Sequence, residues 1–140
     1  MIVVDSSLAL TWCFRDEQTP ASAALLARVA TEGFLVPMLW HLEIANVLQL
    51  AVRRKRITSE LRDASLADLA QLPIHVDDQT IDRAWSSTVK LAQRYDLTAY
   101  DASYLELAMR RNLPLATLDE ALIAAGPRAG VAILPVPTAA

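Results

Sequence analysis

The chain of 140 residues has very little cysteine and glycine, and it has no long apolar run. Its single cysteine, Cys13, excludes an internal disulfide and a zinc site built from several cysteines. Its three dispersed glycines exclude a glycine-rich phosphate-binding loop. No apolar stretch approaches the roughly 18 residues of a membrane span, and Asp5 interrupts the apolar start, which argues against a signal peptide. We therefore expect a protein of the reducing cytoplasm that has no membrane contact.

The charge balance excludes a further class of protein. The formal net charge is −3, whereas a general nucleic-acid coating protein is normally strongly basic. A nuclease stays open, because its catalytic acids are themselves negative and depend on a metal ion for compensation. With 54% hydrophobic residues the chain can form a full core. Its length predicts a single domain over residues 1–140.

Short apolar strands alternate with helical segments along the chain. We expect strands at 2–4, 34–37, 74–76, 115–118 and 131–134. We expect helices at 7–14, 21–31, 40–56, 58–72, 80–95, 98–111 and 119–125, the last of them ended by Gly126 and Pro127. This alternation predicts an α/β fold with a mainly parallel sheet and helices on both of its faces.

Two acids directly follow predicted strands. Asp5 comes after the β-branched run Ile2–Val4, which is typical of a strand buried on both faces. Asp119 follows the fourth strand in the same setting. Ligands of open α/β sheets bind at the carboxyl ends of the strands, so both acids are candidates for a functional site. The alternative is that each carboxylate caps the helix that follows it, which Asp does well.

Two further acids lie at the edge of an apolar helix face. Glu43 falls between Val47 and Leu50 on a helical wheel, where a carboxylate loses water and needs a compensating partner. Asp101 has a similar place in its helix and lies in the first turn, where the helix dipole favours an anion. The alternatives are a glutamate side chain that extends to solvent and a simple helix-end effect at Asp101.

Four carboxylates at one site would repel one another, and some would stay protonated unless a cation were bound. With no cysteine ligands, and with only His41 near these positions, the ligands are hard oxygens. Such ligands favour Mg²⁺ or Mn²⁺ over Zn²⁺. One such ion can generate or orient a hydroxide and a second can stabilise a leaving oxygen, which suits phosphodiester hydrolysis. The four acids therefore predict a metal-dependent enzyme that hydrolyses phosphodiester bonds.

Other chemistry-bearing residues have simpler interpretations. The cluster 53–56, Arg110 and Arg111 could contact RNA phosphates, but a solvated helix end is the simpler explanation. We interpret Cys13 as a core residue and His75 as an ordinary strand residue. The three tryptophans are expected in the core or at an interface: Trp12, Trp40 and Trp85.

Four motifs together resemble the PIN-domain family, and more narrowly the VapC-type toxins of bacterial toxin–antitoxin systems. The motifs are Asp5-Ser6-Ser7 after an apolar strand, Glu43-x-x-Asn46 on a helix, Tyr100-Asp101-Ala102-x-Tyr104, and Thr117-x-Asp119-x-x-Leu122. Any one of them is weak, but the set is specific, and it covers nearly the whole chain in the right order.

The resemblance implies a three-layer α/β/α sandwich with strand order 3-2-1-4-5, so that Asp5 and Asp119 meet at the switch point. It also implies a Mg²⁺- or Mn²⁺-dependent endoribonuclease that acts on RNA, is usually homodimeric and is held inactive by a small antitoxin. By the same resemblance, the metal site comprises Asp5, Glu43, Asp101 and Asp119, and the supporting polar positions are Ser6, Asn46 and Thr117.

Two other functions stay open on the sequence alone. Asp5 could accept a phosphoryl group, although such domains normally have a lysine near the last strands, and Lys55 and Lys90 both lie in predicted helices. The chain could also be a non-catalytic binding module whose acids are helix caps. A dimer or antitoxin surface could come from the apolar helices 21–31 and 40–52, which could equally belong to the core.

Overall fold

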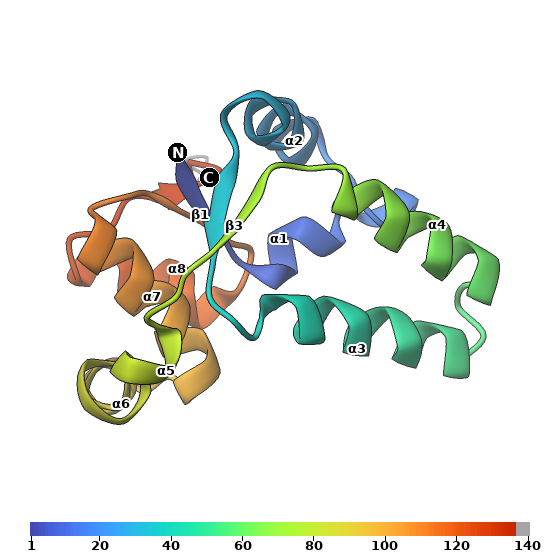
Figure 1. The fold of residues 1–140 in the computed structure, drawn as a ribbon. Helices are drawn as coiled ribbons and strands as arrows, with labels where there is room; N and C mark the ends of the chain where they lie inside the picture. The colour runs from blue at the N-terminus through green and yellow to red at the C-terminus, as the bar shows by residue number, and fades with distance from the viewer. Residues whose placement is uncertain (137–140) are drawn as a thin grey trace.

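The computed structural model describes residues 1–136 as a five-stranded sheet flanked by helices (Figure 1). The strands are β1 (Ile2–Val4), β2 (Phe34–Val36), β3 (Ile74–Val76), β4 (Leu115–Ala116) and β5 (Ile133–Leu134). All neighbouring strands are parallel, and they lie in the order β3-β2-β1-β4-β5. The predicted parallel sheet and its strand order are confirmed.

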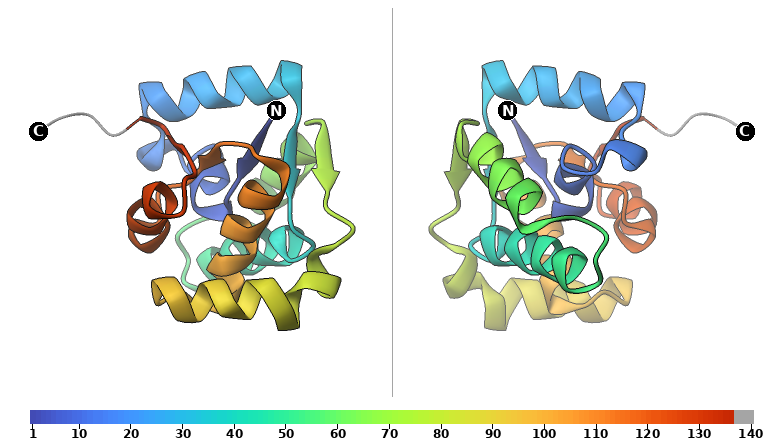
Figure 2. Two further views of the ribbon diagram at one scale, coloured as in Figure 1. Left: turned by 90° about the vertical axis from the view of Figure 1, so that its left-hand side faces the viewer. Right: turned by 90° about the vertical axis from the view of Figure 1, so that its right-hand side faces the viewer.

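Helices cover both faces of the sheet. They are α1 (Ser6–Leu10), α2 (Pro20–Glu32), α3 (Trp40–Arg53), α4 (Ser59–Ala70), α5 (Thr80–Arg83), α6 (Val89–Tyr95), α7 (Ala99–Arg111) and α8 (Glu120–Arg128). A 3₁₀ turn, η1, covers Arg15–Glu17, and a π-helical turn, η2, covers Ala84–Thr88. The two views of Figure 2 place α7 on one side of the sheet and the α3–α4 pair on the other, which confirms the three-layer arrangement. Within residues 1–136, no helix has the length and apolar character needed to cross a bilayer.

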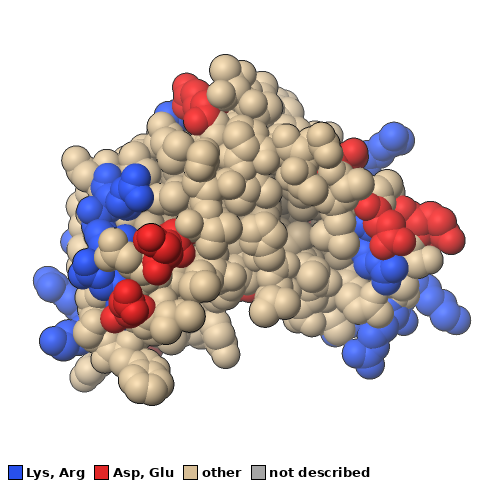
Figure 3. Space-filling model, in the orientation of Figure 1, with Lys and Arg blue, Asp and Glu red and all other residues tan. Residues whose placement is uncertain are grey.

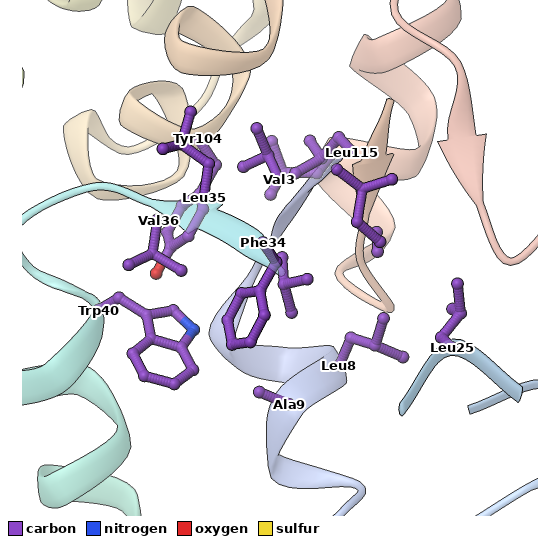
Figure 4. Close-up of a cluster of buried hydrophobic side chains, with 14 of the residues drawn as sticks. Val3, Leu8, Ala9, Leu25, Phe34, Leu35, Val36, Trp40, Tyr104 and Leu115 are labelled. Atoms are coloured by element: carbon purple, nitrogen blue, oxygen red, sulfur yellow. The ribbon is translucent and has the colours of Figure 1, made fainter. Parts of the chain in front are cut away.

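β1 lies at the centre of the sheet and of the core. All three of its side chains are fully buried, as expected for a parallel strand covered on both faces. Each such aliphatic side chain contributes about 1.5–3 kcal/mol through burial. Beside it, Trp40 of α3 packs edge-on against Phe34 of β2, with ring centroids 5.7 Å apart (Figure 4). This packing holds α3 against β2, which is the neighbour of β1 in the sheet.

The helix predicted over 80–95 is interrupted by the π-helical turn η2. A π turn holds an extra residue, which shifts the side chains that follow it around the helix axis. Thr88 in this turn is buried, whereas Trp85 is 96% exposed. A core position for Trp85 is therefore wrong, and its place at an interface stays a prediction.

α8 continues through Gly126 and Pro127, where the sequence predicts a helix end. Pro127 lies in the last turn of α8, so its missing N–H removes only one hydrogen bond near the helix end. Gly126 instead allows α8 to approach β5, since a Cβ at this position would clash with Cδ1 and Cγ1 of Ile133. The predicted break is wrong because close helix–strand packing, not a chain reversal, requires glycine here.

Several elements end earlier than predicted. α1 ends at Leu10, and α3 ends at Arg53 because Lys55 adopts a positive φ of 59°, which a helix cannot continue through. β4 ends at Ala116, and the chain after it forms a hydrogen bond with a side chain in the first turn of α1. The N–H of Leu118 donates to Oγ of Ser7 at 3.0 Å. β2 likewise stops one residue before the predicted limit, and β5 starts two residues later.

A buried ion cluster ties α7 to the end of β3. Arg110 donates to both carboxylate oxygens of Asp77, at 3.1 and 2.7 Å, and to both oxygens of Glu106, at 2.8 and 3.1 Å. Burial alone would raise the pKa of Asp77, but the hydrogen bonds and charge of Arg110 outweigh it and lower that pKa. The prediction of a solvated helix end or a phosphate contact is therefore wrong for Arg110.

Candidate active site

The carboxylate of Asp5 is buried at the carboxyl end of β1, where only 3% of the residue is exposed. Asp5 occupies the N-cap position of α1, but its side chain makes no capping bond. Its Oδ2 instead accepts hydrogen bonds from Oγ of Ser7 at 2.6 Å and from Oγ1 of Thr117 at 2.7 Å. Helix capping is therefore the wrong interpretation of the Asp5 side chain.

Ser7 and Thr117 connect the end of β1 to the loop after β4. Oγ1 of Thr117 accepts from the N–H of Asp119 at 3.0 Å while it donates to Asp5. Ser6 lies farther away, with its Oγ 3.4 Å from Oδ1 of Asp5. Sequence reasoning gave a supporting role to Ser6 and none to Ser7, because only the backbone geometry at the start of α1 distinguishes the two serines.

Asp119 caps α8. Its Oδ2 accepts a hydrogen bond from the N–H of Leu122 at 3.0 Å, which confirms the capping interpretation for this residue. Capping does not remove the residue from a metal site, because a carboxylate has two oxygens and about four lone-pair directions. The structure gives Oδ1 of Asp119 no hydrogen-bond donor in the described part of the chain.

Glu43 lies in the first turn of α3 and is partly buried. The hydroxyl of Tyr104, a fully buried residue of α7, donates to Oε1 of Glu43 and links the two helices across the site. Burial and the charges of Asp5 and Asp101 raise the pKa of Glu43, and the Tyr104 bond only partly offsets them. No role of its own was predicted for Tyr104 from the sequence. Its spacing could have indicated one, because Tyr104 lies three residues after Asp101 and therefore on the same side of α7.

Asn46, predicted to support the site, lies one turn after Glu43 and is exposed. Its side chain makes no hydrogen bond to any of the four acids within the described residues. The structure therefore does not bring Asn46 together with the acids, in contrast to Thr117.

Asp101 is held in the first turn of α7, where its N–H donates to Oγ1 of Thr98 at 3.1 Å. Burial and the charges of Asp119 and Asp5 raise the pKa of Asp101 to about 6. Burial likewise raises the pKa of Asp5, and the charge of Asp119 adds to that rise. Carboxylates that hinder one another's ionisation in this way are stabilised by a bound cation, and their oxygens are the ligands that Mg²⁺ and Mn²⁺ prefer.

The side chains of the four acids nevertheless do not converge on one point as the ligands of a bound metal ion do. Across residues 1–136, no three His, Cys, Asp or Glu side chains are placed to hold a single ion. The bonds to Leu122 and Tyr104 keep Asp119 and Glu43 turned toward their protein partners. The donor chemistry therefore fits a divalent cation, and the shared four-carboxylate site stays a prediction.

The raised pKa of Asp101 predicts how the metal-free protein responds to pH. Since its folded pKa of about 6 exceeds the ordinary 3.8, the folded chain binds this proton more tightly than the unfolded chain. Asp101 thus contributes stability below about pH 4 that is lost as the pH rises to about 6. We expect Asp101→Asn to flatten the fall in Tm between pH 4 and pH 7 in EDTA, measured by circular dichroism. Replacement of the exposed Asp78 by Asn is the control, and equal slopes for wild type and Asp101→Asn would contradict the prediction.

Comparisons with known sequences give a consistent result. The PIN domain family matches residues 2–126. Ribonuclease VapC3 of Mycobacterium tuberculosis is 32% identical over 130 residues, which cover 91% of this chain and 89% of that protein. Ribonuclease VapC9 of the same organism is 32% identical over 121 residues, which cover 85% of this chain and 86% of that protein.

Solved structures share the fold. The crystal structure of PAE2754 from Pyrobaculum aerophilum matches with a TM-score of 0.70 at 22% identity, over 94% of this chain and 81% of that chain. The crystal structure of FitAcB from Neisseria gonorrhoeae matches with a TM-score of 0.66 at 17% identity, over 95% of this chain and 96% of that chain.

Proposed function

Because this chain belongs to the PIN-domain family, we propose that it is a metal-dependent endoribonuclease and the toxin of a toxin–antitoxin pair. The relatives named VapC3 and VapC9 are ribonucleases, which supports RNA as the substrate. The observation that carries the proposal is the buried Asp5 at the sheet's switch point, with the charges of Asp101 and Asp119 close enough to affect ionisation. Ligands bind at this edge of open α/β sheets.

In this proposal Asp5, Asp101 and Asp119 hold a Mg²⁺ or Mn²⁺ ion, and Glu43 binds it too or orients the attacking water. The ion, when bound, supplies a water of lowered pKa and stabilises charge on the leaving oxygen. Ser7 and Thr117 fix Oδ2 of Asp5 through two short hydrogen bonds. Tyr104 fixes Oε1 of Glu43 in the same way. Such partners orient ligands and increase their affinity for a metal.

Mn²⁺ is expected to raise the Tm of the protein and to do so through these acids. An ion that binds only the folded chain stabilises it by RT ln(1 + [L]/Kd), about 2.7 kcal/mol at 100 times Kd. Scanning fluorimetry in EDTA and in MnCl₂ measures the shift, and the shift is expected to shrink in Asp101→Asn. An unchanged wild-type Tm would support the non-catalytic binding module instead.

The phosphoacceptor alternative has little support from the fold. Lys55 follows the end of α3, and Lys90 lines a cavity between α6 and α7, so neither lies at the end of β4 or β5. Labelling with a small phosphodonor would still separate this alternative from hydrolysis, because only an acceptor aspartate retains the label.

The proposed partners require exposed apolar surface. Ile81, Trp85 and Val89, which we call the apolar stripe, are 70%, 96% and 49% exposed along α5–α6, and Leu42 on α3 is 76% exposed. We assign the apolar stripe to a homodimer, since exposed apolar patches mark interaction sites. Light scattering that gives a monomer mass would contradict this assignment.

A second apolar surface suits the antitoxin. A cavity of about 320 Å³ lies between the end of α1, α2 and α4. It includes Cys13, whose pKa burial raises to about 11, so this thiol is an apolar contact and not a nucleophile. Co-expression with a candidate antitoxin, with and without Leu26→Glu in this cavity, tests the assignment; retention of the complex by the variant would contradict it.

A further inference from the structure

A cavity of about 480 Å³ between α5–α6 and α7 contains none of the four acids, and we call it the α6–α7 pocket. Arg83, Lys90 and Arg94 line one wall, and Leu91 and Met109 give it an apolar surface. Figure 3 shows Lys and Arg, with some acidic residues among them, on the side of the molecule where α6 and α7 lie in Figure 1, and a second group at the far end of α3 and α4. The pocket is therefore basic on a chain whose formal net charge is −3.

Three of the cations in this pocket are not neutralised by ion pairs within the described residues. Arg110, which also lines it, is paired with Glu106 and Asp77, but Arg83, Lys90 and Arg94 form no ion pair within residues 1–136. Lys90 and Arg94 are four residues apart on α6, a spacing at which like charges destabilise a helix. An anionic ligand would remove this repulsion.

A buried hydroxyl in the same pocket has no partner. Oγ of Ser87 is shielded from solvent and makes no hydrogen bond to the described residues. Buried polar groups are nearly always satisfied, so an exception calls for a ligand or another explanation. Ser87 lies in the π-helical turn η2, and π turns occur frequently at functional sites. Because Oγ of Ser87 is shielded from solvent, a ligand in the open pocket cannot reach it unless the π turn shifts, and the case for a ligand therefore depends on the three cations.

We propose that the α6–α7 pocket binds one nucleotide of a single-stranded RNA, outside the site of cleavage. Arg83, Lys90 and Arg94 contact its phosphates. Leu91 and Met109 cover an apolar face of its base or ribose. The cavity volume lies in the range of ligand pockets. This inference takes the identity of the ligand from the proposed function, and it gives an acidic chain a defined way to bind RNA.

The α6–α7 hairpin connects this pocket to the candidate active site. α6 ends at Tyr95, directly after Arg94, and α7 begins at Ala99 with Asp101 in its first turn. An RNA strand whose phosphates lie on Lys90 and Arg94 can therefore continue along this hairpin to the acids. The pocket acts in binding and not in the chemical step.

The test measures binding separately from cleavage. A fluorescently labelled single-stranded oligoribonucleotide is titrated with the Asp5→Asn protein in EDTA, and its anisotropy gives Kd at several salt concentrations. Adding Lys90→Glu and Arg94→Glu is expected to weaken binding at least about tenfold, because two phosphate contacts are lost. The slope of log K against log salt is expected to fall by roughly 1.4, about 0.7 for each contact.

The matched control adds Arg53→Glu and Arg54→Glu, the same charge change at exposed positions at the end of α3. Equal weakening by both pairs would attribute binding to overall charge and would overturn the proposal. If the glutamate pair lowers Tm, Lys90→Gln and Arg94→Gln replace it, since glutamine keeps helix propensity. Unchanged binding by a folded variant would also overturn the proposal.

A further arm identifies the ligand. Adenosine monophosphate is expected to compete poorly with RNA; equal competition would make a free nucleotide the ligand and overturn the assignment to RNA. Failure of the wild type to cleave RNA would count against the proposed function alone, because none of these arms measures cleavage.

Discussion

Asp5→Asn is expected to abolish RNA cleavage and to leave the fold intact. Asn has nearly the same shape as Asp, and its carbonyl oxygen can still accept from Ser7 and Thr117, but it lacks the negative charge through which a carboxylate binds Mg²⁺ or Mn²⁺ strongly. We expect at least about a 100-fold loss of rate, because replacing even the partners of metal ligands changes activity 10–100-fold. Cleavage of a labelled RNA in Mn²⁺ measures the loss.

The Tm of Asp5→Asn in EDTA shows whether the variant is inactive because it lacks the carboxylate or because it is unfolded. Burial raises the pKa of Asp5, which means that its negative charge destabilises the folded protein when no cation is bound. A neutral amide avoids that cost, and the variant is therefore expected to unfold at or above the wild-type temperature. Asp78→Asn on the surface is the matched control and is expected to keep full activity. Full activity in Asp5→Asn would remove Asp5 from the mechanism.

Arg110→Met is expected to lower the free energy of unfolding by about 3–5 kcal/mol. It would leave Asp77 and Glu106, whose side chains are only 3% and 6% exposed, as buried carboxylates without a cation. Removing one partner of a buried ion cluster has a cost of this size. Urea denaturation followed by circular dichroism measures the change.

The neighbouring residue supplies the control for this prediction. Arg111→Met changes the same side chain at an exposed position, where a loss within about 0.5 kcal/mol is expected. Adding Asp77→Asn and Glu106→Gln to Arg110→Met is expected to recover part of the lost stability, because the uncompensated charges are then gone. A loss below about 1 kcal/mol in Arg110→Met would show that the cluster does not stabilise the fold.

The features that could be predicted from the sequence depend on local pattern. The run Ile2–Val4 predicted a buried central strand because three β-branched residues suit a strand covered on both faces. Because Asp5 follows directly after this strand, it was also predicted to lie at the edge of the sheet where ligands bind. The strand order itself came from the family resemblance, since alternation of strands and helices predicts a parallel sheet but not its order.

The features that could not be predicted depend on contacts between distant residues. Arg110 looked like an ordinary helix end because, although Glu106 lies four residues before it, its second partner Asp77 lies 33 residues away in the chain. Gly126 looked like a helix stop because its approach to Ile133 exists only after folding. Asp5 and Asp119 follow strands in the same way, yet Asp119 caps its helix and Asp5 does not, because Ser7 and Thr117 hold the Asp5 carboxylate.

The most direct test of the account is to incubate the purified protein with total cellular RNA, with Mn²⁺ or with EDTA, and to map the new RNA ends. The account predicts discrete new ends in Mn²⁺, and none in EDTA or with Asp5→Asn. The absence of new ends in Mn²⁺, or the same ends in EDTA, would contradict the claim that these carboxylates and a divalent cation together cleave RNA.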